Sequence, residues 1–200
     1  MSRVLPILFN MEMVRSILDG RKSCTRRIIK PQSQGYFEVS EEPLYIYDTD
    51  GKQGKITPPY QPGDILYVRE TWKQAPNGYY YYEDWQRSDI ADITKWKPSI
   101  HMPKEAARIW LKVTDVRAER LQEITAESAL LEGTDKYIHL NGKFDKNAIL
   151  TSFMGIWNST IKKSDFDRYG WDTNPYVWVI EFERCEKPKE EKGNDSGDSK

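Results

Sequence analysis

The sequence predicts an α+β domain built on a small β-barrel, and three observations support this expectation. Short apolar runs typical of strands occur early, in the middle and late in the chain, with stretches of helical periodicity between them. The 200 residues fit one domain, and 38% hydrophobic with 30% charged residues is typical of a globular protein. No apolar run approaches the roughly 18 residues of a membrane-spanning helix, so no membrane partner is expected.

The first predicted element is a strand over residues 4–9, and a short helix follows it directly. Asn10 is a good N-cap, since its side-chain oxygen can accept a hydrogen bond from the first helical turn. Val14 and Ile17 share one helical face, and Gly20 can end the helix in the left-handed conformation. The chain is therefore expected to turn sharply after Gly20.

The middle of the chain alternates insertions with strands. Residues 31–60 are rich in Pro, Gln, Ser and Gly and predict a loop or hairpin. The sequence Pro62-Gly63-Asp64 is a turn signal, and the run 65–72 after it predicts a strand. Residues 73–107 are an aromatic-rich insertion that contains a hairpin, and the alternation over 108–117 is the clearest strand pattern.

The last third predicts two helices and a final strand. Thr125 is a good N-cap for a short helix over 126–132, which Gly133 closes. A longer helix is expected over 147–161, with its apolar residues near one face, and a strand over 176–184.

One domain over residues 1–185 accounts for all of these elements, with insertions at about 31–60, 73–107 and 134–147. Residues 186–200 contain no large apolar residue and predict a disordered charged tail. The net charge of the chain is −1, which excludes a protein coated in positive charge. Any nucleic-acid binding must therefore come from a local basic patch.

The cysteines and histidines indicate a reduced, metal-free protein. Cys24 and Cys185 lie far apart, and residues 1–13 lack the apolar core and cleavage site of a signal peptide. We therefore expect free thiols and a cytoplasmic location. His101 and His139 have no ligand-like spacing, so neither a metal nor a cofactor is expected.

The segment after the first helix has the densest functional pattern. Five bases occur in the ten residues 21–30, with no acid among them. They are Arg21, Lys22, Arg26, Arg27 and Lys30. Arginine binds phosphate through paired donors and lysine as a point charge, which favours an anion site. The alternative is a solvated basic turn, because cations also suit the C-terminal end of a helix dipole.

The order of several motifs resembles the activating signal cointegrator homology (ASCH) family, a branch of the PUA-like superfamily. The pattern G-R-K-x-x-T-R after a helix corresponds to residues 20–26, and a P-G-D turn before a strand to residues 62–64. A long strand, a short helix and an aliphatic-aromatic strand follow at 109–116, 124–133 and 177–182. The longer phage and prophage members are the most similar, with further likeness at residues 69–72, 96–103 and 171–175.

This resemblance implies a PUA-like small β-barrel with flanking short helices and a cleft beside the first helix. Many family members are regarded as RNA-binding modules, and some small bacterial members are amidohydrolases that deacetylate N4-acetylcytidine. The lysine, threonine and glutamate of those enzymes match Lys22, Thr25 and Glu132. The threonine would be the nucleophile, a neutral lysine its base, and the glutamate the acid for the leaving base.

Three functions follow as hypotheses, and the oligomeric state stays open. The first is binding of RNA, single-stranded nucleic acid or a modified nucleoside. The second is deacylation of an N4-acylated cytidine, and the third is a protein interaction in a phage or prophage context. The residues expected to bind the ligand are Arg21, Lys22, Arg26, Arg27, Glu70 and His101.

Two assignments have structural alternatives. Glu70 is expected to orient an arginine of the basic turn by pairing with it. The tyrosines at 79–82 would either stack on unpaired bases or pack on the barrel as part of a hairpin, and packing is the favoured interpretation.

Overall fold

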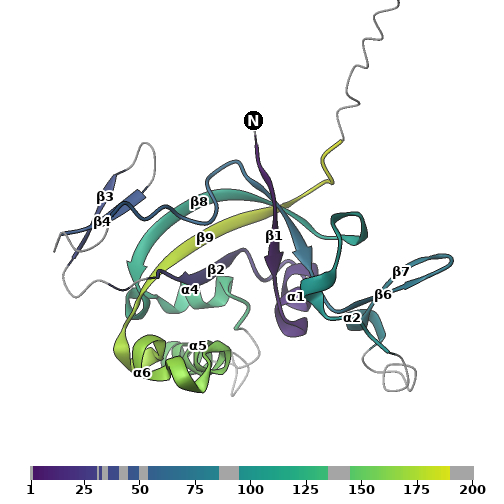
Figure 1. Ribbon diagram of the computed structural model, residues 1–200. Helices are drawn as coiled ribbons and strands as arrows, with labels where there is room; N and C mark the ends of the chain where they lie inside the picture. The colour runs from purple at the N-terminus through teal and green to yellow at the C-terminus, as the bar shows by residue number, and fades with distance from the viewer. Residues whose placement is uncertain are drawn as a thin grey trace, which may run out of the picture.

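The structure is a computed structural model that describes residues 2–30, 32, 36–40, 45–49, 54–85, 95–134 and 145–189. Its centre is a five-stranded sheet in the order β1-β5-β8-β9-β2. Helices α4, α5 and α6 lie together on one side of this sheet, and two hairpins project from opposite ends of the molecule (Figure 1). The α+β class predicted from the sequence is confirmed.

The N-terminal elements follow their local signals closely. Strand β1 spans Val4–Leu8, helix α1 spans Met11–Leu18 and strand β2 spans Cys24–Ile28. The Asn10 side chain caps α1 by accepting the Met13 amide at 2.9 Å. Both helix-boundary predictions are confirmed, since Gly20 ends the helix with a φ of 75°.

Three further strands complete the sheet. Strands β5 (Ile65–Arg69) and β1 are parallel, whereas β5 and β8 (Trp110–Arg120) are antiparallel. Strand β9 (Tyr176–Cys185) lies between β8 and β2 and is antiparallel to both. A register shift between Val113 and Asp115 marks a bulge in β8, and such a bulge increases the local bend of a strand.

The single strand expected over 65–72 is wrong, because the chain changes pairing partner after Arg69. Strand β6 (Trp72–Ala75) pairs instead with β7 (Gly78–Tyr81), which leads into helix α2 (Tyr82–Trp85). The backbone of Trp72 bonds in both directions to Lys97, at 3.2 and 2.8 Å. Alternation of apolar residues does not reveal such an exchange of partners.

The strands do not close into the expected barrel. Within the described residues, β1 and β2 are the two edges of the sheet and share no strand pairing. The sheet is strongly curved (Figure 1), and a side chain reaches from one edge strand to the other: Arg27 Nη2 donates to the Leu8 carbonyl oxygen at 3.0 Å. The architecture is therefore a curved open sheet with short helices.

The second half supplies the helices that face the sheet. Helix α4 (Ala126–Leu131) is capped by Thr125, which accepts the Ser128 amide at 3.1 Å, and helix α5 spans Lys146–Thr160. The remaining short elements are β3 (Phe37–Ser40), β4 (Tyr45–Asp48), α6 (Phe166–Tyr169) and the 3-10 turns Ser99–His101, Lys104–Ala106, Leu121–Glu123, Lys163–Asp165 and Trp171–Thr173.

Three apolar clusters hold these layers together. The first joins α1 to the sheet, the second joins α4 and α5 to β9 and β2, and the third fixes the β6–β7 hairpin. Helix α5 contributes Ile149, Phe153 and Trp157, which are spaced one helical turn apart. None of the described helices is long and apolar enough to cross a bilayer. Most of the expected insertion at 134–147 and of the tail at 186–200 lies outside the described residues.

Candidate functional site

The connection between α1 and β2 is fixed by backbone hydrogen bonds on both sides. The amides of Arg21 and Lys22 donate to the Ser16 carbonyl oxygen at 2.8 and 3.0 Å, and the Ser23 amide donates to Leu131 at 2.9 Å. The Ser16 acceptor lies near the end of α1, and the Leu131 acceptor lies at the end of α4. The basic segment is therefore held between two helix ends, and the side chain of Lys22 is buried there.

Lys22 donates three hydrogen bonds inside the protein. Its Nζ lies 2.7 Å from the Cys24 carbonyl oxygen, 3.1 Å from the Glu132 carbonyl oxygen and 2.7 Å from Glu132 Oε2. A lysine ammonium has three N–H donors, so all of them have acceptors. Burial lowers the pKa of Lys22, and the adjacent Glu132 carboxylate partly opposes that shift.

Glu132 binds a different cation with each carboxylate oxygen. Its Oε1 accepts from Arg26 Nη1 at 3.1 Å, while Lys22 occupies Oε2. The other terminal nitrogen of Arg26 donates to Ser128 Oγ at 3.0 Å and to Glu119 Oε2 at 3.4 Å. The Arg26 side chain is 1% exposed, and its Nε has no hydrogen-bond partner.

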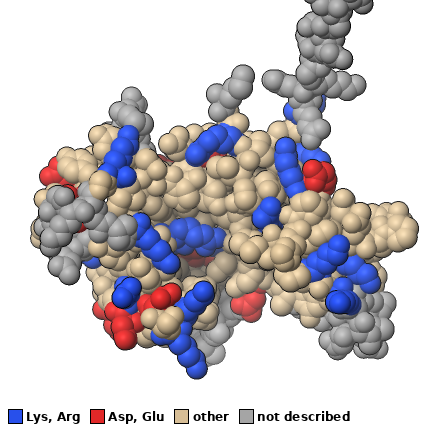
Figure 2. All heavy atoms as spheres, in the orientation of Figure 1, with Lys and Arg blue, Asp and Glu red and all other residues tan. Residues whose placement is uncertain are grey.

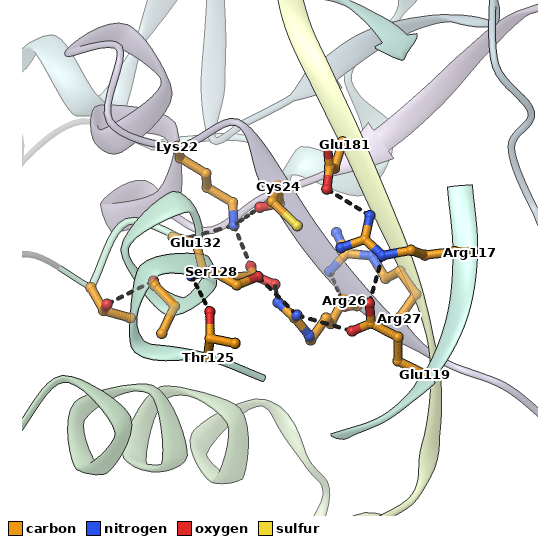
Figure 3. A network of polar contacts seen from close by, with 12 residues as sticks. Lys22, Cys24, Arg26, Arg27, Arg117, Glu119, Thr125, Ser128, Glu132 and Glu181 are labelled. Atoms are coloured by element: carbon orange, nitrogen blue, oxygen red, sulfur yellow. Dashed lines mark hydrogen bonds and ion pairs between the residues drawn. The ribbon is translucent and has the colours of Figure 1, made fainter. Parts of the chain in front are cut away.

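A line of side chains with alternating charge extends from Lys22 and Glu132 across the sheet (Figure 3). Glu119 also accepts from Arg117 Nε at 2.5 Å, and Arg117 Nη1 reaches Glu181 at 2.6 Å. Glu119 and Arg117 were not predicted as part of the site, because nothing local in the sequence connects strand β8 with residues near position 26. The line consists of Lys22, Glu132, Arg26, Glu119, Arg117 and Glu181. Much of the basic charge predicted at this turn is thus neutralised within the protein.

The surface agrees with this internal neutralisation. Lys and Arg side chains appear as separate spots over the face in Figure 2, and some of them lie beside the recess between the sheet and the helices. No continuous basic patch covers the described part of this face. Positive charge on this face is therefore distributed over separate side chains.

Cys24 lies inside the basic motif without being a reactive thiol. Its side chain is buried, and burial together with the Glu132 carboxylate raises its pKa to about 12. The thiol is therefore protonated at neutral pH, and its backbone carbonyl takes part in the site by accepting from Lys22.

Two adjoining cavities open beside this cluster. The first, which we call the β2 cavity, has a volume of about 420 Å³ and lies where the edge strand β2 meets β1 and α5. The second, the α1–α5 cavity, has a volume of about 610 Å³ and is lined by α1, the end of α4 and α5. The cavities share Asn10, Met13, Glu132 and Ile156.

Thr25 lines the β2 cavity and is the candidate nucleophile among its residues. Its side chain is buried, and no described residue is hydrogen-bonded to its hydroxyl. The carbonyl that accepts from Lys22 Nζ belongs to the peptide that joins Cys24 to Thr25. The structure thus places Thr25 and Glu132 in the lining of one cavity, whereas Lys22 lines neither cavity and is bonded to Glu132 behind that lining.

Arg27 and Arg69 also line the β2 cavity, and neither is paired with a carboxylate of the described residues. Arg27 donates to the carbonyl oxygens of Leu8 and Arg26, and its guanidinium lies 5.3 Å from the centre of the Phe9 ring. Burial lowers the pKa of Arg27. Arg69 was not predicted as a site residue, because its position at the end of β5 becomes meaningful only once β5 is aligned with β1.

The other predicted binding residues lie away from the cavities. Arg21 pairs with Asp19 at 3.0 Å and lines neither cavity. His101 is exposed in a 3-10 turn and is likewise absent from both linings. Neither residue is placed to contact a ligand bound in these cavities.

The expectation that Glu70 pairs with an arginine of the basic turn is wrong. Both of its carboxylate oxygens accept from Arg108, from Nε and Nη2, each at 2.9 Å. Burial raises the pKa of Glu70, and the bond to Arg108 opposes this shift. Arg108 is in turn bound to Asp84 of α2 at 2.8 Å, so Glu70 supports the β6–β7 hairpin.

The tyrosines at 79–82 pack against neighbouring aromatic residues, as expected, but the described strands form no barrel for them to pack on. Tyr79 lies against Trp72 with ring centres 5.8 Å apart, and Tyr82 meets Trp96 at 5.3 Å. The aromatic residues that line the β2 cavity are instead Tyr60, Phe153 and Trp157.

Among the described residues, no group of three or more His, Cys, Asp or Glu side chains is placed to hold a metal ion. Comparisons of the chain with protein-family models, with curated proteins and with solved structures find no match. The arguments about function therefore rest on the residues of the site and their geometry.

Proposed function

We propose that the chain is an ASCH-type, PUA-like domain that binds a modified nucleoside in the β2 cavity and hydrolyses an N4-acyl group from its cytosine base. One observation carries this proposal: Thr25 and Glu132 line the same cavity, and Lys22 Nζ lies 2.7 Å from Glu132 Oε2. A hydroxyl, a buried amine and a carboxylate are the groups that acyl transfer through a threonine requires.

The buried pair can supply both a base and an acid. Desolvation destabilises two opposite charges in a buried site, and the pKa of Lys22 is lowered by it. Transfer of one proton from Lys22 Nζ to Glu132 Oε2, across 2.7 Å, gives a neutral amine and a neutral carboxylic acid. The amine is then a base for Thr25, and the acid is a proton donor for the leaving group.

The proposed reaction has two steps. The Thr25 hydroxyl loses its proton to Lys22 and its oxygen bonds to the acyl carbon, while the bond from that carbon to the cytosine N4 breaks and Glu132 protonates N4. Water then attacks the acyl carbon of the ester and gives a proton to the Glu132 carboxylate, while the bond to Thr25 Oγ breaks and Lys22 returns a proton to that oxygen. The products are the free 4-amino base and the carboxylic acid.

The rest of the β2 cavity suits a planar base. Phe153 and Trp157 line it from α5, one helical turn apart, and the Trp157 indole N–H is already bonded to the Tyr169 carbonyl oxygen at 2.8 Å. These rings therefore offer apolar faces to a ligand, and a volume of about 420 Å³ falls within the usual range of small-molecule sites. Helix α1 between β1 and β2, together with the curved sheet, also supports the PUA-like assignment.

Salt-dependent binding of RNA or single-stranded nucleic acid through the basic turn has less support. The side chains of Lys22 and Arg26 are 0% and 1% exposed, and both are paired with Glu132. A phosphate backbone would have to displace that carboxylate to reach them. Binding of this kind would depend on Arg27 and Lys30, which are too few charges for a strongly salt-dependent interaction.

The test is acetate release from N4-acetylcytidine by the wild-type chain and three variants. Thr25→Val removes the hydroxyl at nearly constant volume, and we expect turnover to fall on the order of 10³-fold or more. Thr25→Ser keeps a hydroxyl and should retain part of the activity. Thr160→Val is the matched control, because Thr160 lines the same cavity but bonds the Trp157 carbonyl oxygen at 2.7 Å, away from the Lys22–Glu132 pair.

Thermal unfolding of each variant must remain cooperative, so that lost turnover reflects lost chemistry. Equal activity in wild type and Thr25→Val would exclude threonine as the nucleophile. Cytidine binding without any turnover of N4-acylated substrates would reject the hydrolase and leave a nucleoside-binding module.

A further inference from the structure

The β2 cavity contains two arginines that the proposed acyl transfer does not use, Arg27 and Arg69. Several other arginines of the described chain are ion-paired with carboxylates: Arg3, Arg15, Arg21, Arg26, Arg108 and Arg117. By contrast, Arg69 donates to the Ile100 carbonyl oxygen and to the Tyr67 hydroxyl, each at 3.2 Å. Arg27 likewise bonds to carbonyl oxygens, so neither guanidinium group is ion-paired with a carboxylate of the described residues.

Arg27 and Arg69 belong to different strands, and each strand has a contact with the end of β1. Arg69 is the register partner of Leu8 where β5 pairs with β1. Arg27 comes from the opposite edge strand and donates to the Leu8 carbonyl oxygen at 3.0 Å. Leu8 itself lines the cavity. Two arginines from distant strands thus line the same cavity.

Two N–H donors at this cavity lack acceptors. Arg69 Nε and Arg26 Nε are buried and have no hydrogen-bond partner in the structure. Buried donors without acceptors are unfavourable and uncommon in folded proteins. A ligand oxygen in the cavity would supply the missing acceptor to such a donor.

The charge of the lining is also unbalanced. Three arginines, Arg26, Arg27 and Arg69, face the cavity, whereas Glu132 is the acid that lines it. Both oxygens of Glu132 are already bound, to Lys22 and Arg26. Tyr60 adds no negative charge at neutral pH, because burial raises the pKa of its hydroxyl. The cavity therefore favours an anionic ligand.

We infer that Arg27 and Arg69 bind the phosphate of a phosphorylated nucleoside, so that the ligand of the β2 cavity is a nucleotide. This inference rests on the proposed function, since it adds a phosphate site to a base held beside Thr25. Guanidinium groups match phosphate oxygens with paired donors, and the interaction strengthens away from water. A free mononucleotide and the phosphorylated end of an RNA chain both present this chemistry.

Titration calorimetry of the full chain with cytidine and with cytidine 5′-monophosphate tests the inference. The monophosphate should bind about 10- to 100-fold more tightly than cytidine, as expected for charge-assisted hydrogen bonds. Arg69→Gln should reduce this ratio to within about two-fold. Arg120→Gln is the matched control, since Arg120 also donates to a carbonyl oxygen and lies on a tyrosine ring, 3.7 Å away, but lines neither cavity.

Equal affinities of wild type for the two ligands would overturn the inference, and the proposed function would stand if cytidine binds. A similar loss of both affinities in Arg69→Gln would assign Arg69 a structural role and overturn it as well. Binding of neither ligand, together with no acetate release, would reject both proposals. A 5′-phosphorylated dinucleotide that binds more tightly than the monophosphate would identify an RNA end as the source of the phosphate.

Discussion

Glu132 determines the geometry of the site at the scale of single residues. Its two oxygens are bound by Lys22 and Arg26, and its own backbone carbonyl accepts a third bond, at 3.1 Å, from Lys22. Such a carboxylate cannot rotate without breaking several charge-assisted hydrogen bonds. The orientation of the proposed acid is therefore fixed before a ligand enters.

Glu132→Gln should be strongly destabilising, because it leaves the buried Lys22 without a countercharge and leaves Arg26 with Glu119 as its carboxylate partner. Removal of one partner from a buried ion pair costs about 3–5 kcal/mol. The Lys22→Met/Glu132→Gln double variant should lose less stability than the two single variants lose together, because the unpaired charge of Lys22 is then absent. Urea unfolding with linear extrapolation measures all four states.

An exposed ion pair of the same chain provides the control. Lys146 and Glu127 lie 3.1 Å apart with side chains that are 67% and 61% exposed. Glu127→Gln should change the free energy of unfolding by less than about 1 kcal/mol. Equal effects at Glu127 and Glu132 would show that burial does not govern the Lys22–Glu132 pair.

At the scale of elements, Gly133 fixes the distance between α1 and the end of α4. Its φ is 89°, and a Cβ atom placed there would lie 2.8 Å from both Cβ and Oγ of Ser16. Ser16 also accepts the amides of Arg21 and Lys22 through its carbonyl oxygen. The close approach at Gly133 therefore positions Glu132 and Lys22 at the same time.

Gly133→Ala should destabilise the protein more than Gly63→Ala does. The two glycines have nearly equal φ angles, 89° and 88°, but a Cβ at Gly63 would meet nothing within 4 Å. In both variants, alanine in the left-handed backbone conformation should lower the free energy of unfolding by roughly 1–2 kcal/mol. The clash with Ser16 should add about 1–3 kcal/mol at Gly133 alone, measured by urea unfolding. Equal losses would mean that α4 moves away from α1 at little cost.

Local signals predicted element boundaries well and contacts between distant elements poorly. Asn10 and Thr125 cap helices as expected, because capping depends on residues within one turn. The partner of Glu70 was predicted wrongly, since Arg108 follows it by 38 positions and only the fold brings them together. Lys22, Thr25 and Glu132 became candidate site residues through a family resemblance. Arg69 became a candidate only once the structure aligned the parallel strands β1 and β5.

At the scale of the whole molecule, strands β8 and β9 are the centre of the sheet. They pair over nearly their entire lengths, and each has a second neighbour, β5 for β8 and β2 for β9. The β6–β7 hairpin, in contrast, forms its own two-stranded sheet and projects from the body (Figure 1). Stability is therefore expected to differ strongly between these regions.

Hydrogen exchange should follow this arrangement. Amides of β8 and β9 should exchange slowest, with opening free energies that approach the free energy of global unfolding. Amides of β6 and β7 should exchange several orders of magnitude faster through local opening. Exchange measured by mass spectrometry or NMR resolves these segments. Equal protection of hairpin and central strands would instead mean that the molecule opens as one cooperative unit.

The order of the strands has a consequence for synthesis on the ribosome. Strand β9 lies between β8 and β2 but is translated after every other strand of the sheet. Until residues 176–185 leave the exit tunnel, β2 has no neighbour in the sheet and β8 keeps one side unpaired. Thr25, Arg26 and Arg27 cannot take their final positions before that moment. A nascent chain would carry the side chains of the proposed site long before they could come together, and its open strand edges would be exposed to chaperones meanwhile.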